Sequence, residues 1–263
     1  MNNAILLASI IAGAGIIYDT IEFISGKREL LNQFYNWRIV RSRYYILLNR
    51  PALSLLFDFV FAERIFISLV VVHGISAAMF PFVFYLNVSL AAIPALIVLT
   101  VHCLMNVRIL VGRDGADQMQ SILWASVFAY CLPLHENVKL VVSGFVVAQL
   151  ILSYLTSGLS KLISPVWRKG VAMNLITRMA TYCPPQINTL FKNRSLSFVI
   201  CWLTILFELL SPLLLFFGPT GAIVFIILGI FFHAGIAAGM GLTTFVFAFV
   251  ATYPIVYEFS TKL

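Results

Sequence analysis

Length and composition indicate an integral membrane protein. The chain has 263 residues, of which 61% are apolar and 10% are charged, and its mean hydropathy is +1.00. A bilayer core is crossed by about 20 apolar helical residues, so about eight crossings fit in the chain and leave only short connections. Because no remaining stretch is long enough to bury a core of its own, most soluble enzyme classes, P-loop machines and extracellular disulfide modules are excluded.

The net charge of +7 is concentrated in two connections between apolar runs. Residues 25–51 and 161–194 together hold 12 of the 17 cations. Clustered cations beside apolar segments are typical of contact with anionic lipid head groups. We therefore expect the bilayer surface as a partner and no nucleic acid.

The first apolar run covers residues 4–24. Its start, Met1-Asn2-Asn3, carries no cation, so we expect a retained helix and not a cleaved signal peptide. The basic segment 25–51 follows, with apolar residues at helix-like spacing: Leu30, Phe34, Trp37, Tyr44 and Leu48. This spacing fits an amphipathic segment lying in the interface plane, and an ordinary packed loop is the alternative.

Residues 52–85 are too long an apolar stretch for one crossing. As a helix of 34 residues they would reach about 51 Å, so we expect a break at Glu63-Arg64 and a span at about 65–86. Further spans are expected at about 88–110, 119–134, 138–160, 196–217, 219–238 and 241–259. The pattern predicts an all-α, polytopic transmembrane helical bundle of about eight spans plus an interfacial amphipathic segment, forming a single transmembrane domain over residues 1–263.

Charge also predicts an orientation. The connections 25–51 (net +5) and 161–194 (net +6) fall on one side of the bundle together with a third at 108–118, and the other side carries almost no cations. The positive-inside rule places these connections in the cytoplasm and both termini outside.

Three ionisable residues lie in or at the ends of predicted spans, where each needs a partner or a purpose. Glu208, near the middle of 196–217, is either a protonated acid bonded to a neighbouring helix or the partner of a buried cation. Lys161, at the end of 138–160, is either a lysine that reaches the head groups or, if withdrawn from water, a general base. Tyr154, Gly158 and Lys161 share one helix face at i, i+4 and i+7.

His233 opens a segment of small residues that contains Gly235 and Gly239. This G-x-x-x-G spacing permits close helix packing, and it equally leaves room for a flat ligand beside the imidazole. His73 and His102 have no His or carboxylate at helical spacing, so we expect no metal site.

The same residues carry a family resemblance. Tyr154, Gly158 and Lys161, followed by Trp167, Gly170 and Met173, resemble the segment that bears the catalytic lysine in the membrane domain of vitamin K-dependent γ-glutamyl carboxylases. Glu208 and His233 resemble that domain's following helices by position. The resemblance, to the horizontally transferred transmembrane (HTTM) domain, covers roughly residues 88–259.

The resemblance implies catalytic roles for Lys161, His233 and Glu208, with Lys161 as the base that deprotonates a reduced quinone. We expect cofactor contacts at Tyr154, Gly158, Trp167, Gly235 and Gly239. The resemblance also places the basic connections outside, against the charge rule. We expect no large extramembrane domain after the last helix, which argues against glutamate carboxylation.

Small members of this superfamily are similar to the sporulation-delaying peptide B protein, which takes part in making a secreted toxin peptide. The leading expectation is a multi-pass protein of the bacterial cytoplasmic membrane that acts in maturation or export of such a peptide, with the peptide precursor and a small companion protein as partners. The alternatives are a quinone-linked membrane enzyme and a non-catalytic immunity or assembly factor. The first two require the amine, acid and imidazole to converge in one polar chamber.

Overall fold

The computed structural model is built of α-helices joined by short connections. It describes residues 1–262 except 33–35, 110–113, 179–182 and 184, and no strand occurs in this part of the chain. Four segments in it are long and apolar enough to cross a membrane: Asn2–Gly26, Glu63–Leu86, Glu136–Ile163 and Arg194–Met240. The prediction of an all-α membrane helical bundle is confirmed.

The chain divides by contact into two compact units. The N-terminal unit is Ser9–Lys139, and the C-terminal unit joins Met1–Ala8 to Leu140–Leu263. The single domain expected over residues 1–263 stays a prediction.

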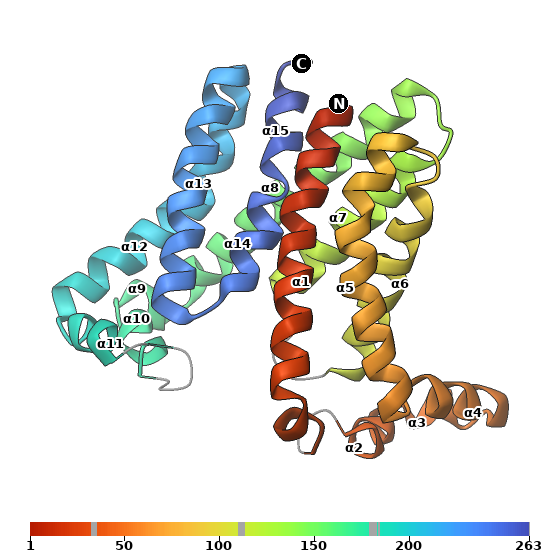
Figure 1. The fold of residues 1–263 in the computed structure, drawn as a ribbon. Coiled ribbons are helices and arrows are strands. Elements are labelled where there is room, and N and C mark those ends of the chain that lie inside the picture. Colours follow the sequence, from red (N-terminus) through yellow and green to blue (C-terminus); the bar gives the residue numbers. More distant parts are fainter. Residues whose placement is uncertain (33–35, 110–113, 179–182, 184, 263) are drawn as a thin grey trace. The chain divides into compact units, whose positions relative to one another are not determined.

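Long helices that pack side by side form the N-terminal unit (Figure 1). They are α1 (Asn2–Asn32), α5 (Glu63–Leu86), α6 (Ala92–Arg108) and α7 (Gly115–Cys131). Small residues bring α1 close to α5, because a Cβ at Gly13 would lie 3.3 Å from the Ala77 carbonyl oxygen and one at Gly74 would lie 3.0 Å from Thr20. The expected span 65–86 is α5, which is long and apolar enough to cross a membrane, whereas the expected spans 88–110 and 119–134 coincide with the shorter helices α6 and α7, of 17 residues each.

Short helices connect α1 to α5. They are α2 (Trp37–Arg41), a 3₁₀ turn η1 (Ser42–Tyr44), α3 (Tyr45–Leu48) and α4 (Pro51–Val60). The chain leaves helical geometry between α4 and α5, so the break predicted at Glu63-Arg64 is confirmed to within three residues. In Figure 1 α4 lies across the end of α5.

The basic segment folds as several short helices that pack against an apolar cluster, and its place in the interface plane stays a prediction. Trp37 and Val40 are buried in an apolar cluster with Phe61 and Phe66, and Tyr44 and Leu48 pack against it. The side chain of Leu30 and all of Phe34 lie outside the described residues. The segment is therefore a chain of short helices anchored by a few aromatic side chains.

The C-terminal unit begins with most of α8 (Glu136–Ile163). It continues through α9 (Pro165–Arg168), α10 (Ala172–Ile176), α11 (Pro185–Phe191), α12 (Arg194–Leu210), the 3₁₀ helix η2 (Ser211–Phe217), α13 (Gly218–Met240), α14 (Thr243–Val250) and α15 (Tyr253–Ser260). The chain turns between η2 and α13 at Gly218, whose φ of 63° favours glycine. A Cβ at Gly221 would lie 1.9 Å from the Leu214 carbonyl oxygen, so η2 and α13 are in direct backbone contact.

The span expected at 241–259 needs correction, because it is two short helices and not one. α14 ends at Val250, and α15 starts at Tyr253 with Pro254 in its first turn. Proline has no N–H to donate to the preceding turn, so the α14 helix cannot continue through it. The Thr252 hydroxyl donates to the Phe249 carbonyl oxygen at 2.6 Å and satisfies one acceptor at the break.

Candidate functional site

An ion pair joins α8 to α12 in the C-terminal unit. The Lys161 Nζ donates to both carboxylate oxygens of Glu208, at 2.8 Å each. The lysine side chain is 18% exposed and that of Glu208 is 6% exposed. Lys161 therefore pairs with the acid of a neighbouring helix, so Glu208 has the cation partner that was one of its two expected surroundings.

Gly158 sets the distance between the two helices that carry this pair. It is buried, and a Cβ there would lie 2.9 Å from the Leu209 side chain and 3.0 Å from the Glu208 Cβ. With a Cβ at position 158 the Leu209 side chain would have to move, and the distance to the Glu208 Cβ would be tighter than nine in ten real Cβ contacts. Glycine at 158 thus lets α12 approach α8 closely enough for the amine and acid to meet.

Two further side chains complete the surroundings of the amine. The Ser157 hydroxyl accepts from Lys161 at 2.5 Å and donates to Glu208 at 3.1 Å. The indole ring of Trp167, in α9, has its centroid 5.2 Å from Lys161 Nζ, within cation–π distance. The structure therefore brings three of the predicted residues, Lys161, Glu208 and Trp167, into one cluster.

A second polar cluster connects α8, α13 and α15. The Tyr154 hydroxyl lies 2.8 Å from His233 Nε2 and 3.0 Å from the Tyr253 hydroxyl. All three side chains are buried. One consistent assignment of protons has Tyr253 donating to Tyr154 and Tyr154 donating to Nε2, which places the imidazole proton on Nδ1.

Aromatic rings enclose this second cluster. The His233 ring stacks on Phe249, with centroids 4.6 Å apart, and Tyr154 meets Phe225 and Phe249 edge to face. Gly229 gives the Tyr253 hydroxyl its place, because a Cβ there would lie 2.1 Å from that oxygen. The rings and the glycine thus fix the positions of the three polar side chains.

The amine, acid and imidazole come from α8, α12 and α13. Lys161 and Glu208 are in direct contact, whereas His233 reaches the same face of α8 through Tyr154, which precedes Ser157 by three residues and Lys161 by seven. Residues three, four and seven apart share a helix face. The geometry is thus two polar clusters along one face of α8, and among the described residues the imidazole contacts Tyr154 and not the amine or the acid, so the single chamber expected from sequence is divided in two.

Gly235 and Gly239 do not pack against another helix among the described residues. A Cβ at either position would have no heavy atom within 4 Å. The expected close packing on this G-x-x-x-G face is therefore not made within the described chain, and the face stays available to lipid, to a ligand or to another protein.

Sequence reasoning missed Ser157, Tyr253 and the pairing of two histidines. The signal for Ser157 was its position four residues before Lys161, on the same face. Tyr253 had no such signal, because it comes from a helix far along the chain. In the N-terminal unit the His73 and His102 rings lie 5.7 Å apart, although each looked isolated in its own span.

The polar side chains of the two clusters could in principle bind a metal ion or a reduced quinone, and these two groups need different ligands. Among the described residues no cluster of three or more His, Cys, Asp or Glu side chains could hold a metal ion. His233 Nδ1 is buried and has no hydrogen-bond partner in the described part of the chain. An imidazole nitrogen left in this way suits one hydroxyl or carbonyl oxygen of a quinone, so the donor set fits that group.

Comparison with protein-family models matches the HTTM domain at residues 122–260. The match starts within α7 and includes both polar clusters of the C-terminal unit. Comparisons with curated proteins and with solved structures find no match. Since the matched region is more than half of the sequence and the helices are those of a membrane protein, the chain belongs to the HTTM domain family.

Proposed function

We propose that this chain is a bacterial cytoplasmic-membrane protein that acts in maturation or export of a secreted peptide, with the Lys161–Glu208 pair as its working site. The observation that carries the proposal is the pair itself, an amine and an acid from two helices in contact at 2.8 Å and mostly withdrawn from solvent. Ionisable groups at such positions are expensive and are retained chiefly for function. Membership of the HTTM family and the resemblance to sporulation-delaying peptide B-like proteins support the choice of process.

The chemistry that this pair supports is proton transfer. At 2.8 Å the Lys161 ammonium can pass a proton to Glu208, which leaves a neutral amine and a carboxylic acid. The amine can then accept a proton from a bound group, and the Ser157 hydroxyl holds both partners in line. The pair would thus take one proton from the bound group. The resulting ammonium of Lys161 would lie beside the anion that this group becomes.

The test is the output of secreted peptide from cells that express the chain together with its flanking genes. We expect Lys161→Ala to abolish output while the protein still inserts, and Lys169→Ala, which removes an exposed cation of the same connection, to leave output unchanged. Protein amount in the membrane is measured alongside. Normal output from Lys161→Ala cells would overturn the proposal.

A second candidate is a quinone-linked membrane enzyme, and the unpartnered Nδ1 of His233 favours it. When bound, a reduced quinone would supply the reducing equivalents. The chain's own part is to hold one ligand oxygen at His233 Nδ1, to order that ring through Tyr154, and to take the hydroxyl proton at the Lys161 amine.

Membrane vesicles given a reduced quinone and oxygen distinguish this candidate. Oxygen consumption that is lost in both Lys161→Ala and His233→Ala vesicles supports it. If neither variant changes oxygen consumption and peptide output is also normal, the remaining reading is a non-catalytic immunity or assembly factor, in which the same substitutions alter stability and partner binding together.

A further inference from the structure

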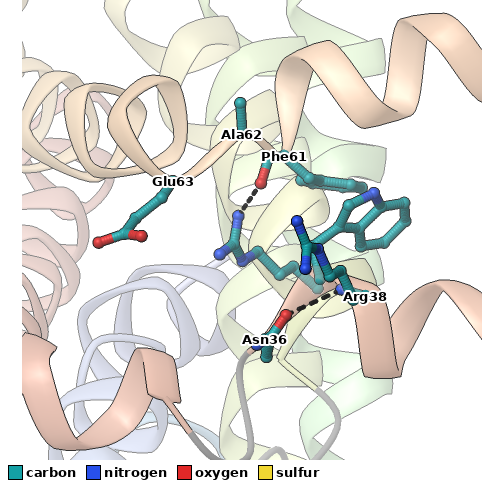
Figure 2. A pocket seen from close by; sticks show the side chains of 7 residues that line it. Asn36, Arg38, Phe61, Ala62 and Glu63 are labelled. Carbon is teal, nitrogen blue, oxygen red and sulfur yellow. Dashed lines mark hydrogen bonds between the residues drawn. The ribbon is translucent and has the colours of Figure 1, made fainter.

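A pocket in the N-terminal unit is lined by two arginines that the proposed function does not use. It has a volume of about 390 Å³ and lies where α2, the α4–α5 break and the end of α6 meet. Arg38 and Arg108 contribute to its lining together with Asn36, Phe61 and Glu63. The pocket is thus a polar hollow at the end of an apolar helix bundle (Figure 2).

Arg108 is a built-in part of this pocket. Its side chain is 2% exposed, it donates to the Phe61 carbonyl oxygen, and its guanidinium carbon lies 4.1 Å from the centroid of the Phe66 ring. A guanidinium carries five N–H donors in a fixed planar fork, and this geometry matches the oxygens of an oxyanion. The contacts hold the fork in place before any ligand arrives.

Arg38 supplies a second, uncommitted cation. Its side chain is exposed and has no ion-pair or hydrogen-bond partner among the described residues, while its backbone N–H donates to Asn36 Oδ1 at 3.0 Å. Figure 2 shows Glu63 on the opposite side of the pocket from Arg38. The lining therefore has two cations against one carboxylate, and that carboxylate is separated from the exposed arginine.

Side chains of α2 on either side of Arg38 bind to α4. The neighbouring Trp37 donates from Nε1 to Asp58 at 2.7 Å, and Arg41 pairs with the same carboxylate at 3.0 Å. These contacts tie α2 to α4, so the backbone of α2 keeps Arg38 at the edge of the pocket. Two arginines positioned in this way are suited to the oxygens of a phosphate group.

Exposed apolar side chains surround the pocket on α4. On α4 the side chains of Leu55, Leu56 and Phe59 are 71%, 55% and 65% exposed. Apolar side chains this exposed on a short helix beside Trp and Tyr residues are typical of a segment buried in the membrane interface. An anion arriving there is most readily the phosphate of an anionic phospholipid.

We infer that the pocket between Arg38 and Arg108 is a binding site for the phosphate of an anionic lipid head group. Arg108 would hold the phosphate from the buried side and Arg38 from the exposed side, with the acyl chains lying along the apolar face of α4. Glu63 opposes the anion and keeps the affinity moderate.

The test uses the full chain in detergent, with lipid binding titrated by native mass spectrometry. We expect phosphatidylglycerol to bind more tightly than phosphatidylcholine, and Arg38→Ala to weaken phosphatidylglycerol binding about tenfold because one charge-assisted contact is lost. Arg43→Ala is the matched control, since Arg43 is an exposed cation of the same segment that does not line the pocket. It should bind as the unchanged chain does.

Further variants keep the inference open to refutation. Glu63→Gln should tighten phosphatidylglycerol binding, an effect that damage to the fold would not produce. Inorganic phosphate that displaces the lipid at equal concentration would assign the site to the free ion and overturn the lipid source. Equal weakening by Arg38→Ala and Arg43→Ala, or equal binding of the two lipids, would show diffuse attraction and overturn the site.

Discussion

At the scale of single residues, the ion pair between Lys161 and Glu208 affects the stability of the fold as well as the proposed proton transfer. Each partner compensates a charge that would otherwise be largely buried, with side chains 18% and 6% exposed. Breaking such a pair from one side usually destabilises more than replacing both partners. This asymmetry separates the role of the pair in stability from its role in chemistry.

The first prediction concerns a double-mutant cycle on this pair. Lys161→Met alone and Glu208→Gln alone should each lower the free energy of unfolding, by about 3 kcal/mol for the variant that leaves a buried charge. The double variant should lose clearly less than the sum, because no buried charge remains. Unfolding of the purified chain in mixed detergent micelles measures all four proteins, and additivity within about 0.5 kcal/mol would contradict the coupling.

The double variant is also the sharpest test of chemistry. It lacks the amine and keeps most of the fold, so we expect it to give no secreted peptide although it is more stable than Lys161→Met. Full peptide output from this double variant would show that the pair serves stability alone.

The second prediction separates the two tyrosines. Tyr154→Phe removes the hydroxyl that meets both His233 and Tyr253, whereas Tyr253→Phe removes one end of the chain. Leaving buried polar groups unsatisfied costs about 1–3 kcal/mol each, so Tyr154→Phe should be the more destabilising change. Thermal unfolding of the two variants beside the unchanged chain measures this order, and the reverse order would be inconsistent with Tyr154 as the shared partner.

The candidate site was partly predictable because helical spacing is a local property. Tyr154, Gly158 and Lys161 could be placed on one face from their numbers alone, and the need of an intramembrane acid for a cation pointed to Glu208. Which hydroxyls would form the chain to His233 depended on how α8, α13 and α15 pack. Tyr253 and the approach of His73 to His102 therefore required the tertiary structure.

At the scale of elements, two glycines on helices of the C-terminal unit have opposite surroundings. Gly158 is pressed against α12, and Gly235 has open space where a side chain would stand. The same substitution at the two sites therefore compares a packing contact with the helix propensity alone.

The third prediction uses this contrast. Gly158→Ala should push α12 away from α8, lower stability by about 1–3 kcal/mol and lengthen the Lys161–Glu208 contact. Gly235→Ala should be neutral or slightly stabilising, because alanine favours a helix by about 1 kcal/mol over glycine. Thermal unfolding measures both, and equal effects would contradict the close approach at Gly158.

The breaks between elements show what apolar patterning can and cannot predict. The break near Glu63 followed from length, because 34 apolar residues exceed one crossing. The break between α14 and α15 was missed because apolar character continues through it and the total length fits one crossing. Pro254 was the available signal, and its consequence depended on whether neighbouring groups could satisfy the freed carbonyls.

At the scale of the whole molecule, two arguments give opposite membrane orientations. The positive-inside rule places the basic connections in the cytoplasm, and the family resemblance places them outside. The two ends of α8 provide the comparison, since His135 precedes this helix and Arg178 lies in the basic connection after it. Both side chains are exposed. A single crossing by α8 places them on opposite sides of the bilayer.

The fourth prediction is that Arg178→Cys is labelled by a membrane-impermeant thiol reagent only after the inner face is made accessible, while His135→Cys is labelled in intact cells. The positive-inside rule gives this direction. The native cysteines are first replaced, because Cys103 is exposed. Labelling of Arg178→Cys from outside intact cells would contradict the charge rule and favour the orientation that the resemblance implies.

The clearance at Gly229 has a consequence for the tolerance of this gene to mutation. The Tyr253 oxygen fits against α13 only because Gly229 has no Cβ. In a saturation library position 229 should therefore accept glycine and reject every other residue. A screen that scores only loss of output would mark it as essential, although it carries no reactive group and belongs to a different helix from Lys161. Second-site revertants with a smaller side chain at residue 253 would then show that substitutions at position 229 act by steric overlap with Tyr253.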